Sequence, residues 1–131
     1  MALDELKKSI LKTYRQKGQK ITCAESCTGG MVAAALTDLP GSSKIFERAY
    51  IAYSNAAKKD MLGILEKTLG NFGAVSEEIA REMAIGALER SGADVSIALT
   101  GIAGPGTSEF KPEGRVCFAR AQKGANCQTL T

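Results

Sequence analysis

The order of the apolar segments is the feature that most constrains the fold of this chain. Residues 95–99 form a nearly continuous apolar run, which is typical of a strand covered on both faces. A helix is predicted directly before it, because Ser76 is a suitable N-cap, Glu77 and Glu78 favour a first helical turn, and apolar residues recur at helical spacing up to Gly92. An amphipathic helix leading into a strand buried on both sides indicates a layered α/β domain.

The remainder of the chain repeats this alternation of helix and strand. Helices are predicted over residues 3–14, 31–37, 55–62 and 77–91, with a single turn at 66–69. Strands are predicted over residues 21–24, 49–53, 95–99 and 115–121, and a hairpin turn at 123–126 leads into a last strand. Such alternation predicts a three-layer α/β sandwich, and 131 residues fit one domain, residues 1–131.

The chain contains no histidine. This excludes Ser-His-Asp and Cys-His catalytic arrangements and removes the commonest zinc ligand. No two of the four cysteines have C-x-x-C spacing, so no metal site is expected. A serine nucleophile in this chain would need lysine, glutamate, aspartate or tyrosine as its base.

Charge and hydropathy exclude further classes of protein. The net charge is +3, the lysines are scattered, and 5% of the residues are aromatic, which argues against a nucleic-acid binder. No apolar run approaches the ~20 residues that a membrane span requires, and the N-terminus does not resemble a signal peptide. Cytoplasmic location with free thiols is therefore the expectation.

The first candidate site is the sequence AESCTGG at residues 24–30, where a strand passes into a helix. A serine hydroxyl at such a junction lies near backbone N–H groups that stabilise an oxyanion or a phosphate. The competing interpretation is structural: Ser26 or Thr28 caps the helix, and Gly29 and Gly30 permit close packing. Cys27 is similarly either a nucleophile or a buried packing residue.

The second candidate site is the sequence TGIAGPG at residues 100–106, which follows the strand at 95–99. Loops at the carboxyl ends of strands in α/β sheets bind ligands, and glycines allow a backbone nest for an anion. The sequence matches neither a phosphate-binding P-loop nor a dinucleotide fingerprint, so a plain loop is the alternative.

Three further residues are candidates to assist Ser26, each with a structural alternative. Lys58 becomes a base if burial lowers its pKa from about 10.4 towards 7, but lysines in charged runs such as Lys58-Lys59-Asp60 are usually solvated. Glu25 is either a base or a structural acceptor. Tyr53 supplies either a hydroxyl donor or a core ring.

Taken together, these segments resemble the CinA C-terminal domain family, which includes stand-alone nicotinamide-nucleotide amidases. The resemblance covers nearly the whole chain in order. It is carried by AESCTGG at 24–30, PGSSKIFERAYIAYSNAAK at 40–58, GAVSEEIAREMAIGAL at 73–88, and TGIAGP with the later KPEGRV within 100–116.

The resemblance implies a three-layer α/β/α sandwich with a mixed, mostly parallel sheet, and an amidohydrolase that converts nicotinamide mononucleotide to nicotinate mononucleotide and ammonia. Ser26 would be the nucleophile, Lys58 its base, and Tyr53 would assist through its hydroxyl. No cofactor or metal is implied. The residues expected to contact the pyridine nucleotide are Glu25, Thr28, Gly29, Gly30, Asn55, Thr100, Gly101 and Gly104.

The sequence departs from the family pattern in two places. Phe110 stands where an acid is usual. The family also typically continues through a final strand and helix that this chain, ending at Thr131, would lack. Loss of that segment would leave weak or absent amidase activity, so a non-catalytic nucleotide-binding or regulatory module is the alternative function. A homo-oligomer and a thiol-dependent enzyme using Cys27 are further hypotheses.

Overall fold

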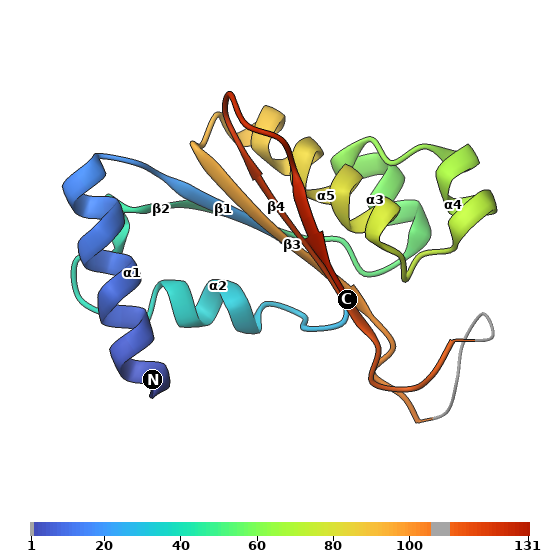
Figure 1. Cartoon of the computed structure of the whole chain (residues 1–131), viewed down its shortest axis with the longest axis horizontal. Coiled ribbons are helices and arrows are strands. Elements are labelled where there is room, and N and C mark those ends of the chain that lie inside the picture. Colours follow the sequence, from blue (N-terminus) through green and yellow to red (C-terminus); the bar gives the residue numbers. More distant parts are fainter. Residues whose placement is uncertain (1, 106–110) are drawn as a thin grey trace.

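The chain folds as one mixed sheet with helices on both of its faces (Figure 1). A computed structural model describes residues 2–105 and 111–131. Along the chain its elements are α1 (Leu3–Lys17), β1 (Ile21–Glu25), α2 (Met31–Leu36), the 3-10 turn η1 (Ser42–Lys44), β2 (Phe46–Ile51), α3 (Asn55–Leu62), α4 (Glu66–Phe72), α5 (Glu77–Ser91), β3 (Val95–Gly101), β4 (Val116–Gln122) and β5 (Gln128–Leu130).

The strand order of the five-stranded sheet is β2-β1-β3-β4-β5. β2, β1 and β3 are parallel, whereas β4 is antiparallel to both of its neighbours, so β4 runs opposite to the other strands. Helices α3, α4 and α5 lie on one side of the sheet and α1 and α2 on the other (Figure 1). The α/β fold with a mixed sheet that was predicted from the sequence is confirmed.

Two element boundaries differ from the prediction for identifiable reasons. β2 begins at Phe46 and ends at Ile51, whereas the sequence predicted 49–53. Its first half carries the charged pair Glu47 and Arg48 at an exposed sheet edge, which breaks the apolar pattern. α4 continues to Phe72 through Gly70, a residue that usually weakens helices.

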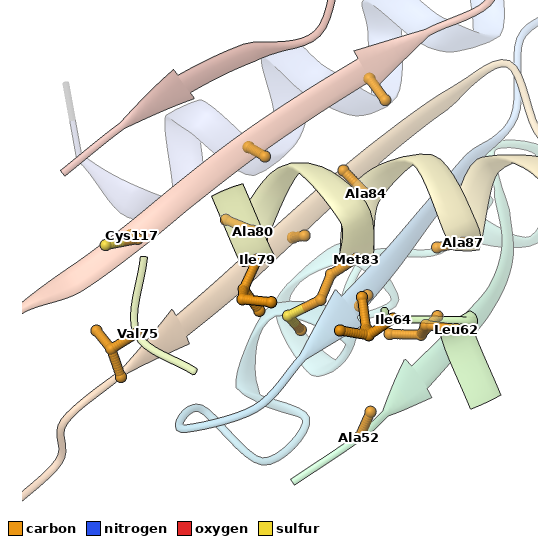
Figure 2. Packing of buried hydrophobic residues seen from close by; sticks show 14 of the residues in the cluster. Ala52, Leu62, Ile64, Val75, Ile79, Ala80, Met83, Ala84, Ala87 and Cys117 are labelled. Atoms are coloured by element: carbon orange, nitrogen blue, oxygen red, sulfur yellow. The ribbon is translucent and has the colours of Figure 1, made fainter. Parts of the chain in front are cut away.

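Small side chains on one face of the sheet let α5 pack closely over its centre. Ala24, Ala98 and Ala119, from three adjacent strands, are fully or almost fully buried. Ile79 and Met83 of α5 are completely buried in the same cluster (Figure 2). The layer formed by α5 is therefore the main core of the domain, and it fixes the ends of the strands from which the site is built.

Gly86 lies where α5 meets the end of α3, and it has no room for a side chain. A Cβ atom at this position would collide with the backbone carbonyl oxygen of Leu62. Alanine normally stabilises a helix relative to glycine. At this position, overpacking against a fixed backbone makes the same substitution destabilising. We expect Gly86→Ala to lower the free energy of unfolding by about 1–3 kcal/mol, measured by urea denaturation.

Gly70 provides the matched control for this prediction. It is also helical, and a Cβ atom there would meet no other atom within 4 Å. Gly70→Ala is expected to raise the free energy of unfolding by about 0.5–1 kcal/mol. Equal stabilisation by both substitutions would show that α3 and α5 do not pack as described.

α1 contacts the domain through an incompletely covered apolar face. It contains no fully buried residue, and Leu3 and Leu6 remain exposed. The helix ends at Gly18, whose φ of 64° lies in the left-handed region. Within the described ranges, no helix is both long and apolar enough to span a membrane.

Candidate active site

Ser26 directly follows β1, at the carboxyl end of a strand between two parallel neighbours. Its backbone N–H continues the sheet by donating to the carbonyl oxygen of Leu99 at 3.1 Å. Because side chains alternate along a strand, Ser26 points to the opposite face from Glu25, towards α3. The side chain is 6% exposed. The backbone of the central sheet therefore fixes the position of this hydroxyl.

Lys58 reaches Ser26 from α3. Ser54 caps this helix by accepting a hydrogen bond from the N–H of Ala57 at 3.0 Å. Lys58 lies on the buried face of the helix, together with Leu62. The Lys58 side chain is 2% exposed, and its Nζ lies 3.1 Å from Ser26 Oγ. The structure thus brings together two residues that are 32 positions apart in the sequence, and it places this lysine in the interior rather than on a solvated surface.

The backbone carbonyl of Tyr53 contacts both members of the pair. Lys58 Nζ donates to this oxygen at 2.8 Å, and Ser26 Oγ donates to it at 3.4 Å. Residue type gives no signal for such a main-chain contact. Tyr53 also borders the cleft and is 65% exposed, and assistance from its phenolic hydroxyl stays a prediction.

The Ser26–Lys58 pair opens into a cleft of about 230 Å³. Among the residues that were predicted to contact substrate, Asn55, Thr100 and Gly101 line this cleft. The Thr100 side chain is buried, and its hydroxyl donates to the carbonyl oxygen of Ala74 at 2.8 Å. Thr100 therefore also fixes the segment before α5 as one wall of the cleft.

Glu25 lies behind the cleft and serves as an internal cap for α2. Its carboxylate is 0% exposed and accepts hydrogen bonds from the Thr28 hydroxyl and from the N–H groups of Gly30, Val32 and Ala33. Burial opposes the charged form, but these hydrogen bonds outweigh it and hold the pKa of Glu25 below its ordinary value. The resulting stability is complete above the ordinary pKa and is lost as the pH falls through the lowered value.

Glu25 occupies the start of α2 from within the protein. The Gly30 N–H and the Thr28 hydroxyl are committed to Glu25, so they do not provide a vacant anion site. The cleft lining does not include four of the residues that were predicted to contact substrate, namely Glu25, Thr28, Gly29 and Gly30. The physical reason is that a buried carboxylate satisfies the helix N-terminus from within the protein.

The loop after β3 is described only in part. Gly104 precedes a cis peptide bond to Pro105 and does not line the cleft. The remainder of the predicted glycine-rich loop, including Gly106 and Phe110, lies outside the described residues.

Cys27 borders the cleft beside Ser26 and is half-buried. Burial raises the pKa of its thiol, while the N–H groups of Cys27 and Thr28 act in the opposite direction. The four cysteines are free thiols. Among the residues that the structure describes, no three histidine, cysteine, aspartate or glutamate side chains are grouped to hold a metal ion.

Lys111 holds the cleft wall in place, a role that the sequence does not predict. Its Nζ donates to the carbonyl oxygens of Phe72 and Val75 at 2.7 and 2.6 Å. These contacts tie the chain before β4 to the segment that forms the cleft wall. A lysine that binds main-chain oxygens 36 or more residues away leaves no local sequence signal.

The fold and the site define an α/β protein with a buried serine–lysine pair in a cleft at the carboxyl edge of a mixed sheet. The chain belongs to the CinA C-terminal domain family, whose family model matches residues 3–131.

Curated relatives include proteins of two lengths. The chain is 52% identical over 122 residues to a protein from Enterobacter agglomerans named nicotinamide-nucleotide amidohydrolase PncC, covering 92% of this chain and 74% of the relative. The relative of the same name from Escherichia coli K12 is 50% identical over 120 residues, covering 91% of this chain and 73% of that protein. A putative competence-damage inducible protein from Caldicellulosiruptor saccharolyticus is 50% identical, covering 90% of this chain but 29% of the relative.

Solved structures agree with the fold. A competence/damage inducible protein from Agrobacterium tumefaciens superposes with a TM-score of 0.93 at 45% identity, covering 98% of this chain and 78% of that one. A CinA superfamily protein from Enterobacter cloacae gives a TM-score of 0.95 at 36% identity, covering 99% of this chain and 77% of that one.

Proposed function

We propose that this protein is an amidohydrolase that converts nicotinamide mononucleotide to nicotinate mononucleotide and ammonia by a serine–lysine mechanism. The observation that carries the proposal is the 3.1 Å approach of Lys58 Nζ to Ser26 Oγ in a buried site that opens to a cleft. The substrate is suggested by the name of relatives about 50% identical to this chain.

The first half of the reaction forms an acyl-enzyme. Neutral Lys58 takes the proton of the Ser26 hydroxyl while Oγ attacks the carboxamide carbon, which gives a tetrahedral oxyanion. This step requires a neutral lysine, and desolvation is the effect that penalises the ammonium form of lysines in general; Lys58 is 2% exposed. The C–N bond then breaks, and the Lys58 ammonium returns its proton to the nitrogen, which leaves as ammonia.

The backbone N–H group of Cys27 is the proposed donor to the oxyanion. In the described part of the chain, this amide donates to no backbone or carboxylate oxygen, in contrast to those of Ser26, Gly29 and Gly30. Cys27 also borders the cleft immediately beside the nucleophile.

The second half of the reaction releases the acid. Lys58, now neutral again, takes a proton from a water molecule that attacks the acyl carbon. Collapse of the second tetrahedral intermediate breaks the ester bond, and Ser26 recovers its proton from Lys58. The Tyr53 carbonyl holds Lys58 Nζ at 2.8 Å and thereby keeps it beside Ser26 for both transfers.

The test is ammonia release from nicotinamide mononucleotide by the 131-residue chain, coupled to chromatographic detection of nicotinate mononucleotide. The proposal expects the two products in equal amounts and saturable kinetics. Binding of the nucleotide without product formation would instead identify a non-catalytic nucleotide-binding module and would overturn the proposed function.

A further inference from the structure

Glu25 is a buried acid next to the nucleophile for which the mechanism above has no use. Adjacent positions on a strand point to opposite faces, so Glu25 faces α2 while Ser26 faces Lys58. Both carboxylate oxygens of Glu25 are engaged. Oε1 accepts from the Thr28 hydroxyl and from the N–H groups of Gly30 and Val32, and Oε2 accepts from the N–H of Ala33 at 2.9 Å.

These contacts anchor the backbone of the loop at residues 26–30, which contains two glycines with positive φ. Gly29 and Gly30 have φ values of 60° and 115°, both in the left-handed region. The loop is fixed at its start by the bond from Ser26 N–H to Leu99 and at its end by the bond from Gly30 N–H to Glu25. Glu25 thus accepts from the amides of Gly30, Val32 and Ala33 and not from the amide of Cys27, the loop residue that borders the cleft beside Ser26.

We propose that Glu25 is a positioning residue whose carboxylate fixes the loop at residues 26–30, so that the Ser26 hydroxyl meets Lys58 and the Cys27 amide is held beside the nucleophile. The inference rests on the proposed acyl-transfer function. Glu25 does not line the cleft, so it acts through the loop rather than by touching substrate.

The test is the Glu25→Gln variant, which keeps the shape of the side chain. In the variant, an NH₂ donor would replace one of the two carboxylate oxygens that accept from backbone N–H groups. The negative charge that anchors the loop would also be lost. We expect kcat to fall by about 100-fold, because small displacements of reacting groups have effects of that size, while KM changes by less than about threefold. Glu25→Asp, which retains the charge on a shorter side chain, is expected to give an intermediate kcat.

Glu77→Gln is the matched control. Glu77 is also a carboxylate that accepts hydrogen bonds at the start of a helix, from the hydroxyls of Thr129 and Thr131, but it does not line the cleft. The same chemical change there is expected to lower the thermal midpoint and to leave kcat within about twofold of wild type.

A second measurement separates this inference from the choice of substrate. A fluorophosphonate forms a bond from phosphorus to Ser26 Oγ, fluoride leaves, and the serine proton passes to Lys58, so no amide substrate is needed. We expect Glu25→Gln to react at least about tenfold more slowly than wild type.

The outcomes are distinct. If the wild-type protein is labelled at Ser26 but does not hydrolyse the nucleotide, the proposed substrate is wrong. In that case the labelling rate of Glu25→Gln still tests the role of Glu25. If Glu25→Gln folds and keeps the wild-type kcat or labelling rate, Glu25 is not a positioning residue. If Glu25→Gln does not fold, wild-type rates in a folded Glu25→Asp variant overturn the inference in the same way. Wild type that neither labels nor hydrolyses overturns both proposals.

Discussion

Replacing Lys58 with methionine is expected to lower the rate of ammonia release by about 10³-fold or more while the protein stays folded. Methionine has a similar length and no charge, so it fills the space of a side chain that is only 2% exposed. The variant retains Ser26 but removes the group, 3.1 Å away, that accepts its proton. The measurement is kcat for nicotinamide mononucleotide, with circular dichroism to verify folding.

Lys59→Met is the control for this variant. Lys59 is adjacent in sequence, but its Nζ is exposed and pairs with Glu66 at 2.6 Å on the surface. Its loss should change the free energy of unfolding by less than about 1 kcal/mol and leave kcat unaffected. If Lys58→Met and Lys59→Met had equal activity, Lys58 would not be the base.

Ser26→Ala is expected to lower kcat by about 10⁴-fold, because it removes the atom that forms the acyl-enzyme. Cys27→Ala is expected to keep kcat within about tenfold of wild type, although both residues border the same cleft. Burial raises the pKa of the Cys27 thiol and so disfavours the thiolate that a cysteine nucleophile requires.

The pair of variants distinguishes a serine from a thiol mechanism in a single assay of ammonia release. Loss of activity in Cys27→Ala with retention in Ser26→Ala would contradict the assignment of Ser26 and would support the thiol-dependent alternative.

The layered fold was predictable because its signals are local. The cap at Ser76, the stop at Gly92 and the apolar run that became β3 each follow from a few neighbouring residues. The edge strand β2 was less predictable at its start, where Glu47 and Arg48 face solvent. Sequence periodicity reports burial, and an edge strand buries too little to produce a clear pattern.

The site was predictable only in part. Family resemblance paired Ser26 with Lys58, whereas residue chemistry alone favoured a solvated lysine, because burial of Lys58 depends on how α3 packs in the fold, chiefly against α5. The role of Glu25 depends on which face of β1 it occupies, and the contribution of Tyr53 comes from a carbonyl. Long-range packing and main-chain geometry of this kind have no signature in residue type.

Fluorophosphonate labelling followed by peptide mass mapping tests the central claim most directly. We expect modification of Ser26 in wild type, protection by nicotinamide mononucleotide, and little or no labelling of Lys58→Met. Modification of another residue, absence of protection by the nucleotide, or equal labelling of Lys58→Met would contradict it.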